Sequence, residues 1–381
     1  MRKIILMLFS VAFLAACSDA GTLKIEVSNP SAVDKSSEIV EIDWSLVSEK
    51  LSPAKDFSLL VLDESGEQVP YQLVTQGEAT PRLLIFPATV KAGAKAVFTL
   101  KKGKPGIFAA RTFGRQVPER KDDFAWENDR VVFRMYGPAL AEENPSNGVD
   151  FWLKRTGDLI VDKFYRDDLE NHKSYHVDHG EGLDCYKVGH TLGAGGIAPY
   201  YQDALWVGNH YDSYRVLDNG PLRTSFELTY NSIPVGQKSV KQTLVITLDA
   251  HSQMNKAVVT CTGDVEPLQL AGGIYLHDTV GVVRADKEAG TIAYAENAVS
   301  DAGLPAGRSY AGLVFPAALQ DVKQEKEHVL GISAYKTGET FTYYFGGGWS
   351  RWGFETDDAW FRYLAAYAAN LKAPLVVSVV R

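Results

Sequence analysis

Short segments in which apolar and polar residues alternate dominate this chain, and they constrain its fold more than any other feature. In an extended strand successive side chains point to opposite faces, so a two-residue period is typical of a strand with one buried face. Turn-forming Gly, Pro, Asn and Asp residues separate the segments. The pattern predicts an all-β protein of antiparallel sheets, with strands that include 23–27, 57–63, 159–166, 223–230, 241–249 and 340–348.

The strand pattern also divides the chain into two domains. In residues 18–110 it predicts a β-sandwich without any amphipathic helix. Residues 111–381 contain more strands than one small sandwich holds, which favours a large antiparallel supersandwich of two sheet layers. Within this second domain, residues 355–374 form the one predicted helix, because acidic residues open the segment and a lysine and a proline close it.

The start of the chain has the form of an export signal. Basic residues precede the apolar stretch 4–16, which is too short for a comfortable transmembrane helix, and a Leu-Ala-Ala-Cys sequence ends at Cys17. We expect residues 1–17 to be a lipoprotein signal peptide, with a lipid attached to Cys17. The folded protein is then expected in the cell envelope, anchored on the periplasmic or the cell-surface side of the outer membrane. An ordinary signal peptide with an incidental cysteine is the alternative.

Charge and cysteine content narrow the choice of partners. The chain has 381 residues and a formal net charge of −8, so it lacks the overall basic character that nucleic-acid binding favours, and no nucleic-acid partner is expected. Two cysteines besides Cys17 are present, Cys185 and Cys261, and no CxxC pattern points to a metal site. A buried thiol or a disulfide between these two is favoured over a catalytic nucleophile.

The stretch 175–196 concentrates groups that can exchange protons. It contains His176, His179 and His190 together with several carboxylates and glycines. Glycines favour a loop at the rim of a sheet, where functional side chains are often held. Histidine titrates near neutral pH, and a neighbouring carboxylate can fix its tautomer, which is what general acid–base catalysis requires. The predicted catalytic residues are Tyr175, His176, Asp178, His179 and Glu181.

Two other interpretations of this stretch stay open. Two histidines with acidic neighbours could hold a divalent ion, but their spacing matches no strong metal motif, so no metal and no other cofactor is expected. A solvated polar loop would also account for the composition. The other isolated histidines are interpreted as structural or surface residues, and they are His172, His251, His277 and His328.

Arginine and aromatic residues elsewhere suit an acidic sugar. Arg134 and Tyr136 are two residues apart in a predicted strand and therefore share one face. Arginine binds a carboxylate through two parallel hydrogen bonds, and aromatic rings offer apolar faces on which sugar rings can stack. Salt-bridged strand edges and core packing are the alternatives. The predicted substrate-binding residues are Arg134, Tyr136, Arg155, His210, Arg215, Trp349 and Trp352.

Five segments together resemble one protein family. They are WENDRVVFRMYGPAL (126–140), NPSNGVDFWLKR (144–155), YHVDHGEGLDCYKVG (175–189), RVLDNGPLRTSFELTY (215–230) and GWSRWGF (348–354). These segments are similar to the domain of unknown function 4861 (DUF4861) family, from about residue 25 to the end. The resemblance implies a secreted protein of bacteria that degrade complex polysaccharides, often polymers rich in uronic acid. It also implies a supersandwich similar to that of galactose mutarotase, but no reaction and no catalytic residues.

Residues and resemblance together favour an enzyme that cleaves oligosaccharides containing uronic acid. In a β-elimination, Arg134 or another basic residue would neutralise the carboxylate while His176, His179 or Tyr175 took the proton from C5. In a hydrolysis, two carboxylates would straddle the glycosidic bond. The candidate carboxylates are Glu127, Asp178, Glu181 and Asp184. A sugar mutarotase or epimerase, and a non-catalytic glycan-binding lipoprotein, are the alternatives.

Overall fold

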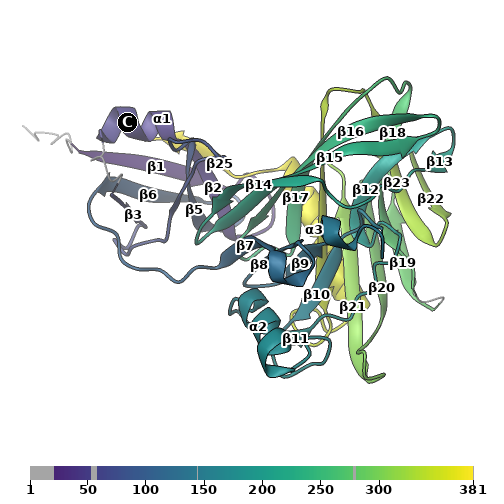
Figure 1. Ribbon diagram of the computed structural model, residues 1–381. Coiled ribbons are helices and arrows are strands. Elements are labelled where there is room, and N and C mark those ends of the chain that lie inside the picture. The colour runs from purple at the N-terminus through teal and green to yellow at the C-terminus, as the bar shows by residue number, and fades with distance from the viewer. Residues whose placement is uncertain (1–20, 53–57, 144, 278–279, 381) are drawn as a thin grey trace, which may run out of the picture.

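The computed structural model describes residues 21–52, 58–143, 145–277 and 280–380. The expected signal peptide with Cys17 lies outside these residues. Within them the strands pair antiparallel and form an N-terminal β-sandwich followed by a larger supersandwich, as the alternating pattern predicted (Figure 1). No helix in the described part of the chain is long and apolar enough to cross a membrane.

Two small sheets form the N-terminal domain. Alternation in its first strand turns Leu23, Ile25 and Val27 inward, onto a core that both sheets share. One sheet has the order β25-β1-β6-β3 and the other has the order β2-β5-β4. The bounds are β1 (Thr22–Ser28), β2 (Lys35–Asp43), β3 (Leu59–Leu62), β4 (Gln72–Val74), β5 (Leu83–Val90), β6 (Lys95–Lys102) and β25 (Val376–Val379).

The N-terminal domain contains a helix that the sequence did not predict. The alternating pattern continues through Trp44. Strand β2 nevertheless ends at Asp43, and helix α1 (Trp44–Leu51) begins at Trp44. Trp44, Val47 and Leu51 are buried, and their spacing of three and four residues gives the helix one apolar face. The prediction of a domain without a helix is therefore wrong, because so short a helix leaves only a weak periodic signal.

The end of the chain returns to the N-terminal domain. Strand β25 pairs antiparallel with β1, so that Val379 lies opposite Ile25. Figure 1 shows this yellow strand beside the purple strands of the first domain. The expected boundary near residue 110 falls between β6 and the next strand, but the second domain does not extend to the end of the chain. Residues 376–379 complete the first domain instead.

Three sheets build the larger domain. The widest has the order β14-β15-β16-β17-β24-β21-β20-β19, and the two five-stranded sheets have the orders β13-β12-β18-β23-β22 and β11-β10-β9-β8-β7. The bounds of the widest sheet are β14 (Ser213–Asn219), β15 (Arg223–Val235), β16 (Lys238–Asp249), β17 (Met254–Thr262), β19 (Val282–Asp286), β20 (Thr291–Val299), β21 (Pro305–Val314) and β24 (Thr340–Trp349). The bounds of the other two are β7 (Thr112–Val117), β8 (Asp123–Asn128), β9 (Val132–Met135), β10 (Asp150–Lys154), β11 (Gly182–Leu183), β12 (Ala194–Tyr201), β13 (Ala204–Leu205), β18 (Leu268–Tyr275), β22 (Asp321–Glu325) and β23 (His328–Tyr335).

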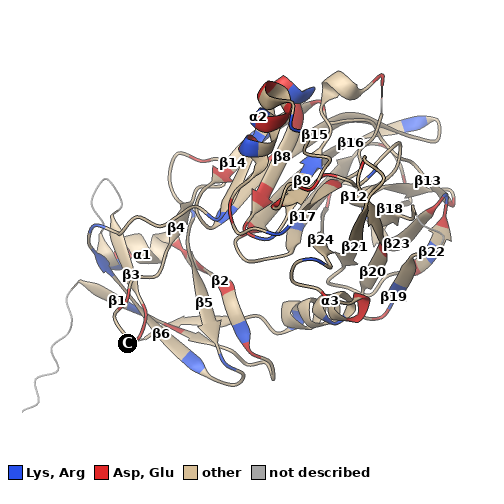
Figure 2. Cartoon of the chain, turned by 90° about the horizontal axis from the view of Figure 1, so that it is seen from below, with Lys and Arg blue, Asp and Glu red and all other residues tan. Residues whose placement is uncertain are grey.

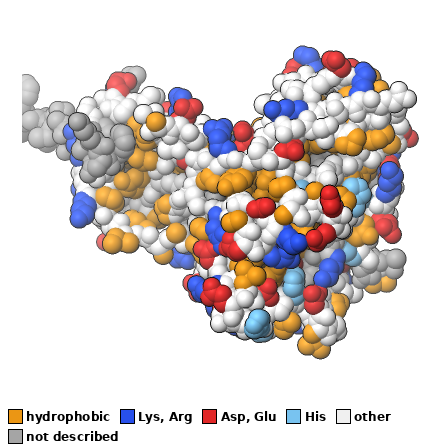
Figure 3. Space-filling view, viewed as in Figure 1, with side chains coloured by type: hydrophobic (Ala, Val, Ile, Leu, Met, Phe, Trp, Pro, Cys, Tyr) orange, Lys and Arg blue, Asp and Glu red, His pale blue; other side chains and the backbone are white. Residues whose placement is uncertain are grey.

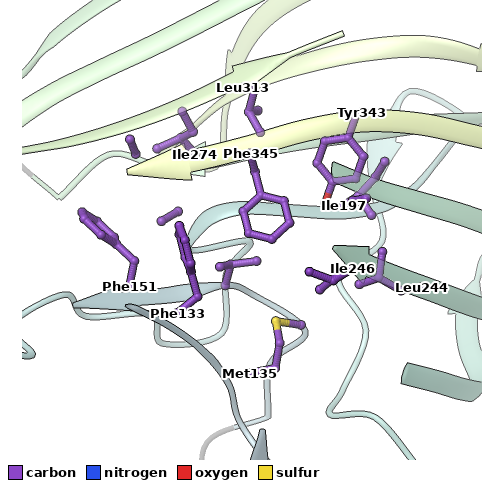
Figure 4. Close-up of a cluster of buried hydrophobic side chains, with 14 of the residues drawn as sticks. Phe133, Met135, Phe151, Ile197, Leu244, Ile246, Ile274, Leu313, Tyr343 and Phe345 are labelled. Carbon is purple, nitrogen blue, oxygen red and sulfur yellow. The ribbon is translucent and has the colours of Figure 1, made fainter. Parts of the chain in front are cut away.

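One apolar core joins these three sheets. Phe133 on β9 and Phe151 on β10 contact Phe345 on β24 (Figure 4). Ile197 on β12 and Ile274 on β18 complete the same cluster. The rings of Phe133 and Phe345 are edge to face, with centroids 5.5 Å apart. Aromatic pairs in this geometry are stabilising beyond their buried area. The core therefore fixes β9 and β10 against the wide sheet, and these two strands carry residues of the candidate site.

The glycine run 346–348 in β24 makes this close packing possible. A Cβ on Gly347 would lie 2.6 Å from the ring of Phe151, and a Cβ on Gly348 would lie 2.8 Å from the ring of Phe354. Real Cβ atoms do not approach other atoms so closely, so both positions require glycine. The run serves packing on both faces of β24.

The C-terminal helix α3 (Asp357–Lys372) confirms the predicted helix. The hydroxyl of Thr356 accepts a hydrogen bond from the Ala359 N–H at 3.2 Å and caps the first turn, where acidic residues also favour the helix dipole. Trp360 and Leu364 are buried against β20 and β21, so the helix covers one face of the wide sheet (Figure 2).

The segment 159–166 does not form the predicted strand. It is largely part of helix α2 (Val161–Asn171), in which Val161, Phe164 and Tyr165 are buried at helical spacing. The carboxylate of Glu127 accepts hydrogen bonds from the first backbone N–H groups of this helix, including that of Val161 at 2.8 Å. A tertiary contact from β8 thus stabilises a helix start that the local sequence does not signal.

Glu127 also forms a fully buried ion pair, which generates a stability prediction. Its Oε2 lies 2.7 Å from Nζ of Lys154, and both side chains are 0% exposed. Glu127→Gln would leave the lysine charge buried without its partner, and we expect a loss of about 3–5 kcal/mol in the free energy of unfolding. The control is Glu339→Gln in the exposed pair with Lys336, which should cost about 1 kcal/mol or less.

The measurement is urea denaturation followed by circular dichroism. Equal losses for the two variants would show that the buried pair does not support α2 and β8.

Candidate active site

A pocket of about 650 Å³ opens where the segment 172–190 approaches the loop 300–304 between β20 and β21. This volume lies within the range of about 300–1,000 Å³ that is common for small-molecule sites. Apolar groups and a few polar groups line it together. The lining includes Phe151, Leu153, Cys185, Tyr186, Lys187, His277, Glu296, Val299, Ser300, Asp301 and Ser309.

His277 and Glu296 form a histidine–carboxylate pair in this pocket. Nδ1 of His277 lies 3.0 Å from Oε1 of Glu296, and Nε2 lies against the backbone carbonyl of Lys187. Both ring nitrogens therefore face acceptors, which favours the doubly protonated imidazolium. Burial lowers the pKa of His277, but the contacts with Glu296 and the Lys187 carbonyl outweigh it and leave the pKa above its usual value.

No local pattern in the sequence marks this pair. His277 stands alone after β18, and Glu296 lies in the middle of β20, on a different sheet. From the sequence alone, His277 is interpreted as a structural or surface residue, whereas the structure places it in the lining of the pocket. Only the packing of two sheets brings the imidazole and the carboxylate together.

His176 lies next to the same pocket, and its pKa is shifted in the opposite direction. Its Nδ1 lies 3.0 Å from the Asp184 carbonyl oxygen and 3.9 Å from Oδ2 of Asp301, and Asp301 lines the pocket. Burial, together with the nearby guanidinium of Arg134, lowers the pKa of His176 in spite of these acceptors. The imidazole is therefore neutral near pH 7.

The hydrogen bond of His176 selects its tautomer. A neutral ring that donates from Nδ1–H to a carbonyl carries a lone pair on Nε2. Nε2 has no hydrogen-bond partner within the described ranges, and the side chain is 26% exposed. His176 can therefore accept a proton from a group that enters the pocket edge.

The remaining predicted catalytic residues lie in three different places. Tyr175 is buried, and its hydroxyl contacts Arg120 at 3.1 Å and Arg134 at 3.2 Å. Nε2 of His179 lies 3.0 Å from the Ser174 carbonyl within its own exposed loop. Glu181 pairs with Lys163, and Asp178 pairs with two arginines. None of the five predicted catalytic residues is in the lining of the pocket, but His176 lies next to it, with Nδ1 3.9 Å from Oδ2 of the lining residue Asp301.

Arg134 lies in a buried charge cluster beneath the loop. Its Nη2 lies 2.6 Å from Oδ2 of Asp150 and 2.7 Å from Oδ2 of Asp184, and the residue is 3% exposed. These internal carboxylates already match its charge, so Arg134 does not face a substrate in this structure. Tyr136 stacks on this guanidinium and its ring also lies beside the ring of buried His210, away from the pocket.

The other predicted binding residues divide between two surfaces. Arg155 and Arg351 both lie over the ring of Trp349, 5.7 and 5.5 Å from its centroid, and both contact the carboxylate of Asp178. Trp349 is 1% exposed and belongs to the apolar core, so its ring is not open to a sugar in this structure. The partly exposed Trp352 lies three residues further on. Arg215 on β14 pairs with Glu227 and packs near Gly77 of the N-terminal domain, far along the sheet from the pocket lining.

The two cysteines of the larger domain do not form a disulfide. Cys185 and Cys261 are both free, and burial raises the pKa of both thiols, which disfavours the nucleophilic thiolate. Within the described ranges, no group of three or more His, Cys, Asp or Glu side chains is arranged to hold a metal ion. On the face shown in Figure 3, acidic and basic side chains are interspersed over the larger domain and histidine side chains reach the surface.

Comparison with known proteins places the chain in a family. The family model described as "Domain of unknown function (DUF4861)" matches residues 27–377. The chain belongs to the DUF4861 family. This confirms the resemblance carried by the five sequence segments. The DUF4861 chain is also similar to "Uncharacterized protein P7" of Formosa agariphila, with 28% identity over 402 residues that cover 100% of both chains.

Solved structures with a similar arrangement of sheets are more distant. A protein in the Glycosyl Hydrolase Family 38 from Enterococcus faecalis has a TM-score of 0.49 and 11% identity, and an alpha-mannosidase from Enterococcus faecalis V583 has a TM-score of 0.46 and 10% identity. Each similarity covers 94% of the DUF4861 chain but only 47% and 46% of the other chain, respectively. The DUF4861 chain thus spans about half the length of these structures, and scores at this level do not establish an activity.

The buried carboxylates around Arg134 generate a prediction about pH. Burial raises the pKa of Asp123 from 3.8 to about 6, and the charge of Arg134 opposes this only in part. The folded state therefore favours the neutral acid, and the free energy of unfolding should fall as pH rises from about 4 to about 6. Asp123→Asn removes this titrating group. The free energy of unfolding of the variant, minus that of the wild type, should therefore rise by up to about 3 kcal/mol as the pH rises over that range.

Urea denaturation of both proteins at a series of pH values measures the difference. A difference that stays constant from pH 4 to pH 7 would contradict the raised pKa of Asp123.

Proposed function

We propose that this protein is a carbohydrate-active enzyme that acts on oligosaccharides containing uronic acid, by β-elimination in the pocket between the loops 172–190 and 300–304. One observation carries the proposal. His277 lines the pocket, His176 lies next to it in contact with the lining residue Asp301, and their surroundings shift their pKa values in opposite directions. Such a separation is what assigns one group as a base and the other as an acid near neutral pH.

His176 is the proposed base. Its Nε2 lone pair would take the proton from C5 of the uronic acid, and the Asp184 carbonyl would hold Nδ1–H and so keep the ring orientation. The electron pair of the broken C–H bond forms the C4=C5 double bond. The bond between C4 and the glycosidic oxygen then breaks, and that oxygen leaves with the bonding pair and needs a proton.

His277 is the proposed acid. Glu296 keeps its ring protonated, and the Nε2–H now held by the Lys187 carbonyl would pass to the leaving oxygen once the substrate replaces that carbonyl. Lys187 lines the same pocket, and its ammonium group pairs with Asp301. It would turn to the substrate carboxylate and neutralise its charge, which makes the C5 proton more acidic. Phe151 and Tyr186 offer apolar walls for the sugar ring.

Hydrolysis is the second candidate, because Glu296 and Asp301 both line the pocket. A hydrolase needs two carboxyl groups on either side of the bond, one protonated and one ionised. Hydrogen bonding to Lys187, only partly opposed by burial, lowers the pKa of Asp301, which suits the ionised role. Two further alternatives would use the same pocket: a mutarotase that interconverts anomers, and a lipoprotein of the cell envelope that binds without turnover. The products that form distinguish these alternatives from elimination and hydrolysis.

The first test removes the base. We expect His176→Ala to lower kcat by about 10²–10⁴-fold on a uronate oligosaccharide, because a positioned general base contributes about this much. The matched control is His179→Ala, three residues away in the same loop, which should keep near wild-type activity because its imidazole contacts the Ser174 carbonyl of its own exposed loop. The readouts are the ultraviolet absorbance of the unsaturated product and the appearance of reducing ends.

The two readouts also separate the candidates. New reducing ends without the ultraviolet absorbance indicate hydrolysis. If neither readout changes but NMR shows exchange between anomers, the protein is a mutarotase. The assignment of His176 fails if its alanine variant turns over substrate as fast as the His179→Ala control.

The second test concerns the pH profile. We expect a bell-shaped dependence of kcat/KM, with an acid limb below 6.5 from His176 and an alkaline limb above 6.5 from His277. Glu296→Gln removes the carboxylate that keeps His277 protonated, so the alkaline limb should move to lower pH while the acid limb stays. A variant in which neither limb moves would show that His277 does not supply the proton.

A further inference from the structure

A second hollow of the larger domain lies between helix α3 and strands β19 and β20 at the edge of the wide sheet (Figure 2). Its volume of about 340 Å³ falls at the lower end of the range of about 300–1,000 Å³ that is common for small-molecule sites. The sequence analysis assigned no binding residue to this surface. We call the hollow the α3 groove, and its lining includes Arg284, Arg362, Ala365, Ala368, Ala369 and Lys372.

The α3 groove and the pocket lie on opposite faces of the wide sheet. Ala293 of β20 lines the groove and belongs to the same apolar cluster as Trp360 and Leu364 of α3. Glu296 lies three residues further along β20 and lines the pocket. Because successive side chains of a strand point to opposite faces, Ala293 and Glu296 face away from each other. A ligand in the groove therefore leaves the pocket free.

Three alanines of α3 keep the groove open. Ala365 lies three residues before Ala368 and four before Ala369, so the three methyl groups share one side of the helix. Short side chains at these positions leave space beside the helix and give the groove an apolar floor. Ala366 of the same helix is also exposed but is not part of the lining.

Positive charge dominates the lining of the groove. Arg284, Arg362 and Lys372 line it together with one carboxylate, that of Asp286. Oδ1 of Asp286 accepts a hydrogen bond from the Ala289 N–H at 2.8 Å in the turn between β19 and β20. Neither Arg362 nor Lys372 pairs with a carboxylate in the part of the chain that the structure describes. On a protein with a formal net charge of −8, this local excess of positive charge favours an anionic ligand.

Arg284 can exchange its present partner for a ligand. Its guanidinium carbon lies 4.6 Å from the centroid of the Phe361 ring, and its Nη2 lies 3.3 Å from Oδ1 of Asp358. The side chains of Arg284 and Asp358 are 61% and 63% exposed, and so exposed an ion pair contributes little to stability. A ligand carboxylate could therefore replace Asp358 and accept two parallel hydrogen bonds from the guanidinium.

We propose that the α3 groove binds an acidic sugar unit of the same polymer on which the pocket acts. The inference rests on the proposed function, because it takes its ligand from there. The cations of the groove bind the sugar carboxylate, and the apolar face of the sugar ring packs on the methyl groups of Ala365 and Ala369. A concave groove suits a ligand that enters it better than the flat surface of a membrane. Binding at the groove raises the concentration of the polymer near the pocket.

The test is isothermal titration with tetrasaccharides from a panel of uronate polymers, with a neutral tetrasaccharide alongside. All titrations use the His176→Ala background, in which the proposed elimination does not consume the ligand. We expect an acidic tetrasaccharide to bind at two sites. Ala369→Leu fills the groove without changing a charge, and Arg362→Gln removes one cation. Each should weaken one of the two sites by about tenfold, as expected for the loss of one charge-assisted contact or of the space for the ring.

Each variant has a matched control. Ala366→Leu adds the same side chain to α3 outside the groove. Arg166→Gln removes an exposed arginine of helix α2 that, like Arg362, has no ion-pair partner within the described ranges. Both controls should leave the affinities of both sites unchanged.

The proposal is overturned if Ala369→Leu and Arg362→Gln bind like their controls, if the neutral tetrasaccharide binds the groove equally well, or if no acidic member of the panel binds. Binding of anionic phospholipid vesicles that depends on Arg362, without binding of any tetrasaccharide, would make the groove a membrane contact and would also overturn it. Arg362→Gln changes an exposed side chain, so its result stands even if Ala369→Leu folds poorly.

The same data separate this inference from the proposed elimination. Acidic tetrasaccharide binding that Arg362→Gln weakens, without any product from the wild type, supports the groove and contradicts the elimination. Unsaturated product from the wild type, with tetrasaccharide binding that Arg362→Gln leaves unchanged, supports the enzyme and contradicts the groove.

Discussion

The buried guanidinium of Arg134 is the contact on which the geometry of the candidate site depends. It lies on β9, binds Asp150 on the adjacent strand and Asp184 just after β11, and donates to the hydroxyl of Tyr175. These contacts fix both ends of the segment 175–184 against the sheet. Because breaking a buried ion pair leaves an uncompensated charge, the segment has one strongly favoured position. His176 takes its orientation from that position through the Asp184 carbonyl.

Local patterns in the sequence predicted much of the architecture and only part of the site. Alternation located most strands and capping signals located α3, because both depend on neighbours along the chain. Helix α2 was missed because Glu127, from another strand, stabilises its start. The pair of His277 and Glu296 arises from the packing of two sheets, and no spacing in the sequence records it. Arg134 was predicted to bind a substrate carboxylate, but it is buried between Asp150 and Asp184, a position that depends on three separate segments.

The charges of the site are arranged in layers. Beneath the loop, buried carboxylates and Arg134 balance one another and set geometry. In the pocket, His277 pairs with Glu296 and Lys187 pairs with Asp301 beside apolar groups. At the surface, Arg155 and Arg351 share the one carboxylate of Asp178, which leaves a local positive charge on an acidic protein. An anionic ligand would therefore be attracted to this face although the whole chain repels it.

The return of β25 to the N-terminal domain has a mechanical consequence. Strand β1 lies between β25 and β6, so antiparallel ladders hold it on both edges along most of its length. Tension applied at the start of the chain would load these ladders in shear, and many hydrogen bonds would have to break together before β1 could slide out. The N-terminal domain would therefore be the first part of the protein to resist a pull on the leading end of the chain.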